Sequence, residues 1–241
     1  MNKADYLEAL AAESEALLTA AAAVSLDSPV KNCGEWTMAE LVGHQAFVWG
    51  LATANVKAAG ENAAPATEKP EDESKLIEWA ASVRATMLEV FEMADPAAPA
   101  WTFAANNQTA GFWQRRMVAE TVVHRWDAET AAGSTNPIAP ALASECIDEY
   151  TEVGLRFSGG RPNREYPATS LHVHCTDVEG EWLLVGTDGP DFTVTREHAK
   201  GDAAARGAAQ ALLLWMWGRD GGDVEILGDA SVADTWRELC P

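Results

Sequence analysis

A carboxylate and an imidazole four residues apart are the first feature of this sequence that could do chemistry. Glu120 and His124 lie in the stretch RRMVAETVVHRWD, which spans residues 115–127. On a helix, side chains four positions apart meet on one face, and helical bundles present such pairs to metal ions. The spacing alone does not distinguish a metal site from a chance pair.

A second histidine, His44, lies in the middle of the apolar helical stretch LVGHQAF. Because its neighbours are apolar, we expect its side chain to point inward. One interpretation is a core histidine held by a hydrogen bond, and the other is a third metal ligand from a facing helix. Two histidines and one carboxylate leave a coordination position open for water or substrate, which is typical of catalytic zinc sites. The residues alone leave both interpretations open.

Other reactive side chains have simpler interpretations. His172 and His174 share one face of a predicted strand and could bind a metal, but we interpret them as exposed sheet histidines. Cys33 and Cys175 could be reactive, although nothing close to them in sequence would activate either thiol. The arginines of the 115–127 stretch are expected to pair with acidic side chains: Arg115, Arg116 and Arg125.

Four amphipathic helices in the first half of the chain would position these residues. Apolar residues recur at helical spacing over residues 4–24, and the capping box Thr37–Glu40 opens a second helix. Further helices are predicted over residues 73–93 and 112–131, the latter ending at Gly133 as a C′ glycine. Helices of these lengths predict an antiparallel four-helix bundle.

The pattern changes after Pro137, where a further helix over residues 140–157 precedes shorter elements. Residues 169–175 alternate with a period of two, and the turn at Glu179-Gly180 leads to a return strand. The elements predicted after this hairpin are a strand over 191–195, a helix over 202–217, a strand over 224–227 and a helix over 231–239. We therefore predict a two-domain α+β fold, with a helical domain over residues 1–157 and a small α+β domain over residues 158–241.

The composition is that of a globular chain, with 47% hydrophobic residues and a formal charge of −20. Such a charge repels phosphate backbones and anionic lipids, so we expect neither nucleic acid nor membrane as a partner. The longest apolar run, residues 208–217, is too short to span a bilayer, and no signal-peptide core follows the first residues. Four scattered cysteines favour a reducing, cytoplasmic location. We expect a monomer or a homodimer.

Several segments resemble the DinB-like, mycothiol-dependent maleylpyruvate isomerase family. Residues 34–44, GEWTMAELVGH, are similar to its W-T-x-x-x-L-x-x-H opening, and residues 115–128 resemble its fourth-helix signature. The segments LHVHCTD, GEW and WGR, at residues 171–177, 180–182 and 217–219, resemble its second domain. The resemblance therefore covers nearly the whole chain. It implies a DinB-like four-helix bundle and a sterol-carrier-like C-terminal α/β domain, with zinc or another divalent metal on His44, Glu120 and His124.

Thiol-assisted chemistry is what the resemblance implies, with mycothiol or a similar low-molecular-weight thiol as cofactor. A metal-bound thiolate adds to an activated double bond, the bond rotates while it is single, and elimination returns the trans isomer. Without the elimination, the same site is an S-transferase. The function expected is thus a mycothiol-dependent isomerase, maleylpyruvate isomerase-like, or a thiol transferase. The alternative is a non-catalytic metal-binding module that is regulatory or binds a small molecule.

Arg219 matches the arginine that the family's second domain is expected to offer to a substrate carboxylate. A guanidinium suits this role because it grips a carboxylate with two parallel hydrogen bonds. Gly218 also reads as a helix cap, and a cation beside a helix C-terminus is favourable by itself, so a capping role stays open. A dicarboxylate would require a second cation, and the loop over residues 60–72 offers Lys69 alone, which leaves the substrate open.

Overall fold

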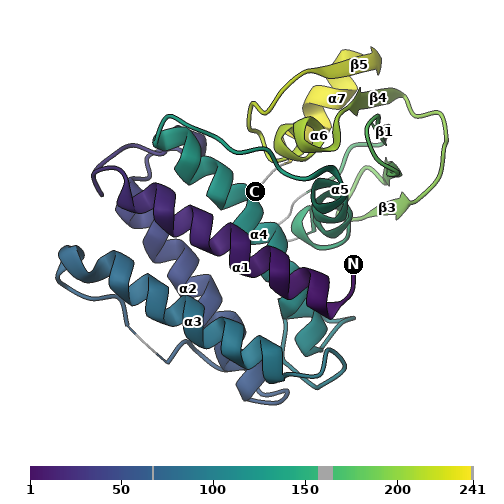
Figure 1. Ribbon diagram of the computed structural model, residues 1–241. Helices are drawn as coiled ribbons and strands as arrows, with labels where there is room; N and C mark the ends of the chain where they lie inside the picture. Colours follow the sequence, from purple (N-terminus) through teal and green to yellow (C-terminus); the bar gives the residue numbers. More distant parts are fainter. Residues whose placement is uncertain (67, 157–164, 240–241) are drawn as a thin grey trace. The chain divides into compact units, whose positions relative to one another are not determined.

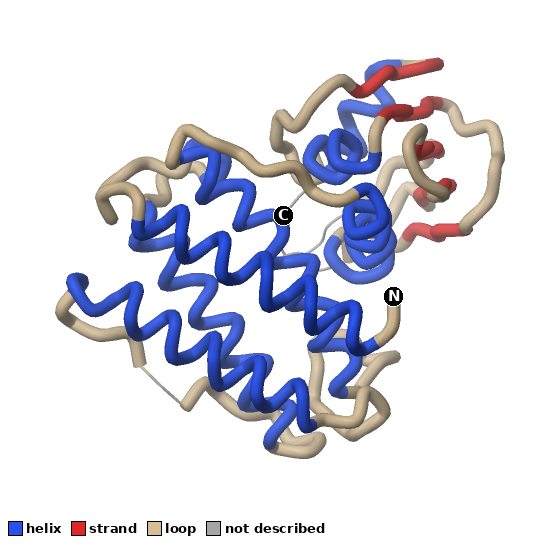
Figure 2. Tube along the Cα trace, in the orientation of Figure 1, coloured by secondary structure: helices blue, strands red, loops and turns tan. Residues whose placement is uncertain are grey.

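The computed structural model describes residues 1–66, 68–156 and 165–239, which form two compact units, Met1–Asn136 and Pro137–Pro241. The described residues form helices in the first unit and a mixture of helices and a five-stranded sheet in the second (Figures 1 and 2). The predicted two-domain α+β class is therefore confirmed. The boundary predicted between residues 157 and 158 lies outside the described residues. In the structure, the helix that follows Pro137 groups with the second unit.

Four long helices make up the first unit, where α1 packs against α4, and α2 packs against both α3 and α4 (Figure 1). Their bounds are Lys3–Ala22 for α1, Met38–Lys57 for α2, Leu76–Met93 for α3 and Ala110–Ala131 for α4. Two 3₁₀ turns, η1 (Lys31–Cys33) and η2 (Glu73–Lys75), precede α2 and α3. All four predicted helices are confirmed.

Local signals in the sequence fix where the two site-bearing helices begin and end. Thr37 caps α2, with its side chain accepting from the backbone of Glu40 while the Glu40 carboxylate accepts from the backbone of Thr37 at 2.7 Å. Helix α4 ends as predicted at Gly133, whose φ of 81° suits glycine. The orphan carbonyl of Glu129 accepts from Ser134 at 3.0 Å, which closes the Schellman motif.

The second unit is a five-stranded sheet with helices packed on one face. Its elements are α5 (Pro140–Glu149), η3 (Tyr150–Gly154), β1 (Ser170–Cys175), β2 (Glu181–Gly186), β3 (Phe192–Thr195), β4 (Ala203–Gly207), α6 (Ala209–Met216), β5 (Val224–Gly228) and α7 (Ala230–Arg237). The strand order is β3-β2-β1-β4-β5, with β1 and β4 parallel and the other pairs antiparallel. On the helix-covered face, Leu171 and Leu184 of the sheet line a small cavity together with Met216 of α6 and Trp236 of α7. Alternate residues of β1 therefore point to the opposite face.

The structure corrects one predicted helix. Residues 202–217 were expected to be helical throughout, but residues 203–207 form β4, and the helix begins only at Ala209. Three consecutive alanines favour a helix locally, whereas here they pair with β1, which supplies their backbone hydrogen-bond partners. Among the described residues, no helix combines the length and apolar character that a membrane crossing requires.

Candidate metal centre

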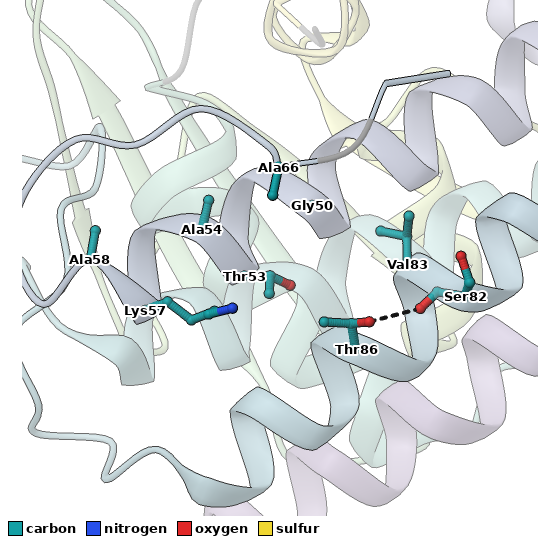
Figure 3. Close-up of a pocket in the computed structure, with 9 residues that line it drawn as sticks. All are labelled: Gly50, Thr53, Ala54, Lys57, Ala58, Ala66, Ser82, Val83 and Thr86. Carbon is teal, nitrogen blue, oxygen red and sulfur yellow. Dashed lines mark hydrogen bonds between the residues drawn. The ribbon is translucent and has the colours of Figure 1, made fainter. Parts of the chain in front are cut away.

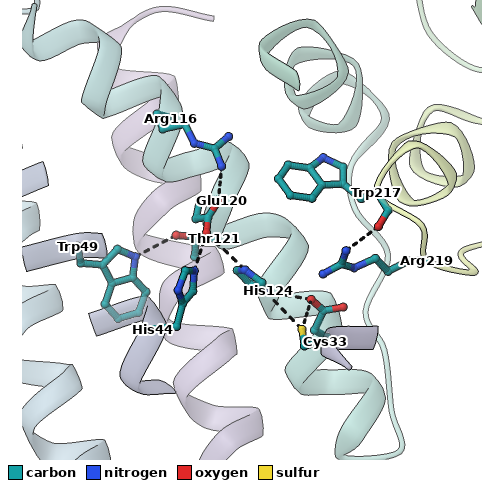
Figure 4. A network of polar contacts seen from close by, with 10 residues as sticks. Cys33, His44, Trp49, Arg116, Glu120, Thr121, His124, Trp217 and Arg219 are labelled. Carbon is teal, nitrogen blue, oxygen red and sulfur yellow. Dashed lines mark hydrogen bonds and ion pairs between the residues drawn. The ribbon is translucent and has the colours of Figure 1, made fainter. Parts of the chain in front are cut away.

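The three side chains singled out in the first unit converge on one point (Figure 4). His44 Nε2 from α2 lies 2.9 Å from Glu120 Oε1, and His124 Nε2 lies 3.4 Å from the same oxygen. One ligand atom from each residue lies within 4.8 Å of the others. Ligand atoms about 2.0–2.2 Å from a tetrahedral zinc ion lie roughly 3.3 Å apart. The triad of His44, Glu120 and His124 thus has nearly the spacing that a metal ion requires.

Outer partners hold two of these ligands in a metal-binding orientation. His124 Nδ1 lies 3.0 Å from Asp127 Oδ2, and since a carboxylate only accepts, Nδ1 carries a proton and Nε2 is the nitrogen at which a metal ion would replace a proton. Arg116 donates to Glu120 Oε2, which leaves Oε1 turned toward the two imidazoles. A carboxylate behind a ligating histidine is a regular companion of metal sites. The donors therefore fit a divalent metal.

The electrostatics of the centre favour an ionised carboxylate beside a positive charge. Burial opposes ionisation of Glu120, but the Arg116 guanidinium and the two imidazoles hold the pKa of this carboxyl well below its usual range. Burial also opposes a charge on His124, but hydrogen bonds to Asp127, Cys33 and Glu120 raise the pKa of the imidazole well above its usual value. The carboxylates of Glu120 and Asp127 thus stabilise a positive charge at His124, where a bound metal ion would also carry positive charge.

Two further residues of the loop before α2 border the triad. The Trp36 ring lies 5.0 Å from the His44 ring and 6.2 Å from the His124 ring, centroid to centroid. Cys33 Sγ lies 3.3 Å from Asp127 Oδ2 and 4.0 Å from His124 Nδ1. The sequence did not predict the position of Cys33, because this residue is distant in the chain from His124 and Asp127. The contact between His124 and Asp127 could have been predicted, since residues three apart on a helix lie on one face.

A sequence model of the mycothiol maleylpyruvate isomerase N-terminal domain matches residues 7–129 of this chain. The chain belongs to the mycothiol maleylpyruvate isomerase family. The matched residues run from α1 into α4 and include the whole triad. No curated protein and no solved structure matches the chain. The match confirms the family resemblance over residues 7–129.

Asp127→Asn is expected to weaken metal binding by about 10- to 100-fold, the usual cost of losing an outer partner of a ligating histidine. The amide keeps the size of the side chain but lacks the charge that holds the Nδ1 proton of His124. Equilibrium titration of the apo protein with Zn²⁺ measures the change. Asn32→Ala is the control, because Asn32 donates at 3.0 Å to Asp127 Oδ1, the carboxylate oxygen that does not face His124. Equal affinities of Asp127→Asn and the wild type would contradict the positioning role.

A cavity of about 340 Å³ lies elsewhere in the first unit (Figure 3). Its walls come mainly from α2 and α3, and its lining residues are Gly50, Thr53, Ala54, Lys57, Ala58, Ala66, Ser82, Val83 and Thr86. The triad contributes no wall to it, so we do not assign the metal chemistry to this cavity. Lys69 lies against α2 beside the residue that precedes His44, because its Nζ would be 3.7 Å from a Cβ built on Gly43.

In the second unit, Arg219 follows α6 as the sequence suggested. Gly218 has a φ of 73° and donates to the Trp215 carbonyl, and the backbone of Arg219 donates to the Leu214 carbonyl. The Arg219 guanidinium donates to the Trp217 carbonyl at 2.5 Å (Figure 4). The capping contacts that the sequence left open are therefore present, and a carboxylate-binding role stays a prediction.

Other predicted side chains fall into clear environments. Arg116 and Arg125 pair with acidic residues of α1 and α4, as expected. Burial, with the charges of Asp177 and Glu181, raises the pKa of Cys175 to about 12, so its thiol stays protonated and unreactive. The interpretation of His172 as exposed is wrong, because it is only 6% exposed.

Proposed function

We propose that this protein is a metal- and thiol-dependent enzyme, either an isomerase of the maleylpyruvate type or an S-transferase, that acts on a small carboxylate-bearing substrate. The observation that carries the proposal is the convergence of His44, Glu120 and His124, with their outer partners in place. The family match supports mycothiol, or a similar low-molecular-weight thiol, as the cofactor. Zinc suits a donor set of two imidazoles and one carboxylate, as do several other divalent ions.

The triad residues would hold the metal, and the chain's other residues would orient and shield it. A divalent metal bound there would coordinate the thiol and hold it as a thiolate. Asp127 fixes the ring of His124, and Arg116 fixes the carboxylate of Glu120. The Trp36 ring flanks both imidazoles. His44, with 30% of its side chain exposed, lies on the side from which thiol and substrate would enter.

We assign recognition of the substrate carboxylate to Arg219, whose backbone is fixed by the turn that ends α6. A guanidinium presents five N–H donors in a planar fork, a geometry that suits a carboxylate. A cation is needed because the chain's net charge of −20 repels an anionic substrate.

Arg219→Lys is expected to lower kcat/KM by about 10-fold or more, because lysine keeps the charge but loses the two parallel hydrogen bonds. The zinc content should stay unchanged. Arg206→Lys is the matched control, since Arg206 lies in the same unit and pairs with Glu225 on the surface. Full turnover in both Arg219→Lys and Arg219→Ala would leave Arg219 as a helix cap only.

Metal analysis of the purified protein, followed by a thiol-transfer assay with mycothiol and an activated double bond, tests the proposed function. Turnover that requires both the metal and the thiol supports it. Bound metal without turnover for any such substrate would instead identify a non-catalytic metal-binding module. We propose a reducing, cytoplasmic location for the reaction, because the four cysteines are scattered through the sequence.

A further inference from the structure

Three of the five histidines of the chain gather around one carboxylate in the second unit. Glu181 Oε2 lies 2.6 Å from His198 Nδ1 and 3.2 Å from His172 Nε2, and Glu181 Oε1 lies 3.4 Å from His174 Nδ1. One ligand atom of each residue lies within 4.8 Å of the others. We call these four residues the sheet cluster. It shares no residue with the triad.

The pairing register of the strands places three members of the sheet cluster side by side. His172 and His174 are two apart on β1, so both point away from the face that packs against the helices. Glu181, the first residue of β2, is the cross-strand partner of His174. Ala204 of β4 is the partner of His172 on its other side, and its small side chain leaves space beside the ring. The convergence is therefore built into the sheet.

The fourth member, His198, comes from the loop between β3 and β4, which is anchored at both ends. At the start of the loop, Arg196 forms ion pairs with Asp148 and Glu152. At its end, the Asp202 carboxylate accepts from the backbone and the hydroxyl of Ser170, both at 2.8 Å.

Gly201 brings the same loop close to β1. A Cβ on this glycine would lie 3.0 Å from the backbone nitrogen of His172 and 3.1 Å from the carbonyl oxygen of Ser170. Only glycine permits this approach without displacing backbone. The loop is thus held against β1 within three residues of His198, which keeps the imidazole over the sheet.

The geometry and charge of the sheet cluster suit a metal ion. The three ring centroids are 5.5–5.9 Å apart and the rings are nearly perpendicular, at 77–89°. The contacts of 2.6–3.4 Å to Glu181 bracket the separation of roughly 3.3 Å expected between ligands of tetrahedral zinc. Burial lowers the pKa of His172 and so favours the neutral imidazole that binds metals. For Glu181, burial raises the pKa, but the bond from His198 and the nearby imidazoles lower it overall, which favours the carboxylate.

Access is provided by a cavity of about 300 Å³ beside the sheet cluster. His172 and His198 form part of its wall, together with Lys200, Ala204 and Leu227. A metal ion held by these imidazoles would border this space and could take a further ligand from it.

We propose that His172, His174, His198 and Glu181 form a second binding site for a divalent transition-metal ion, such as zinc, in the second unit. Imidazole ligands favour zinc, copper or nickel over calcium and magnesium. The proposal goes beyond the proposed function and does not depend on it.

Titration of the full-length apo protein with Zn²⁺ alone tests the second site. The wild type should bind two equivalents, and the double variant His44→Ala/His124→Ala, which lacks two triad ligands, should keep one. In that background, His198→Ala should lower the zinc affinity of the remaining site by at least about 10-fold, because it removes a ligand and not merely an outer partner. His198 is 79% exposed, so the folded state should tolerate this change.

Glu197→Gln in the same background is the control, since Glu197 is the exposed neighbour of His198 on the same loop. His174→Ala, from β1, provides a second ligand variant and should weaken binding as His198→Ala does. Circular dichroism shows whether each variant is folded. Absence of zinc binding in the double variant, or equal affinity of His198→Ala and Glu197→Gln, would overturn the second site. The two proposals can be tested separately, because the sheet cluster would still bind its zinc ion if the triad proved to be inactive.

Discussion

His124→Ala is expected to remove the metal from the bundle and to lower thiol-transfer activity by more than about 100-fold. Loss of an outer partner of a ligand costs up to about 100-fold, and loss of the ligand itself should cost more. The imidazole of His124 links a ligand to an outer partner, because its Nε2 faces Glu120 and its Nδ1 faces Asp127. Glu120→Gln should have a similar effect, since the amide loses the charge that balances both the metal and Arg116. Metal content per chain and the rate with saturating thiol measure these effects.

Met93→Ala is the control for these ligand variants. Met93 is the last residue of α3 and is 82% exposed, so its loss should alter neither the metal content nor the rate. Because the sheet cluster could retain its own zinc, the metal content is best compared in a His198→Ala background. Full activity in His124→Ala would refute the assignment of the chemistry to the triad.

The bundle could be predicted from the sequence because its signals are local. A capping box at Thr37 and a C′ glycine at Gly133 mark helix ends within a few residues of chain. The pairing of Glu120 with His124 follows from helix geometry alone. The distance of His44 from Glu120 and His124 depends on how α2 packs against α4. The apolar neighbours of His44 predict that its side chain points inward, but they do not determine which residues it meets there.

The features that the sequence did not reveal depend on contacts between distant segments. Strand β4 consists of residues that favour a helix locally, and it is a strand because β1, some 30 residues earlier, offers a parallel edge. His198 joins the sheet cluster only because Arg196 and Asp202 tie its loop to other elements. No periodicity in the sequence carries that information.

Arg125→Met is expected to lower the free energy of unfolding of the first unit by about 3–5 kcal/mol, the usual cost of breaking a buried ion pair from one side. Arg125, which follows His124 on α4, is 2% exposed and donates to Glu13 of α1 and to Glu129, both at 2.7 Å. It also donates to the Asn136 carbonyl at 2.6 Å. The methionine fills much of the volume but leaves the carboxylates of Glu13 and Glu129 without the cation that they share.

Urea unfolding of the full chain, followed by circular dichroism, measures the loss, and the control is Lys75→Ala. Lys75 pairs with Asp72 at 3.8 Å on the surface, where a pair contributes less than about 1 kcal/mol. The triple variant Arg125→Met/Glu13→Gln/Glu129→Gln should recover part of the loss, because removing the carboxylates removes the unpaired charges. A loss below about 1 kcal/mol in Arg125→Met would show that the ion pairs contribute no more than surface pairs. A large loss with partial recovery would show that these charges lock α1 to the helix that carries Glu120 and His124, and so hold the metal ligands in register.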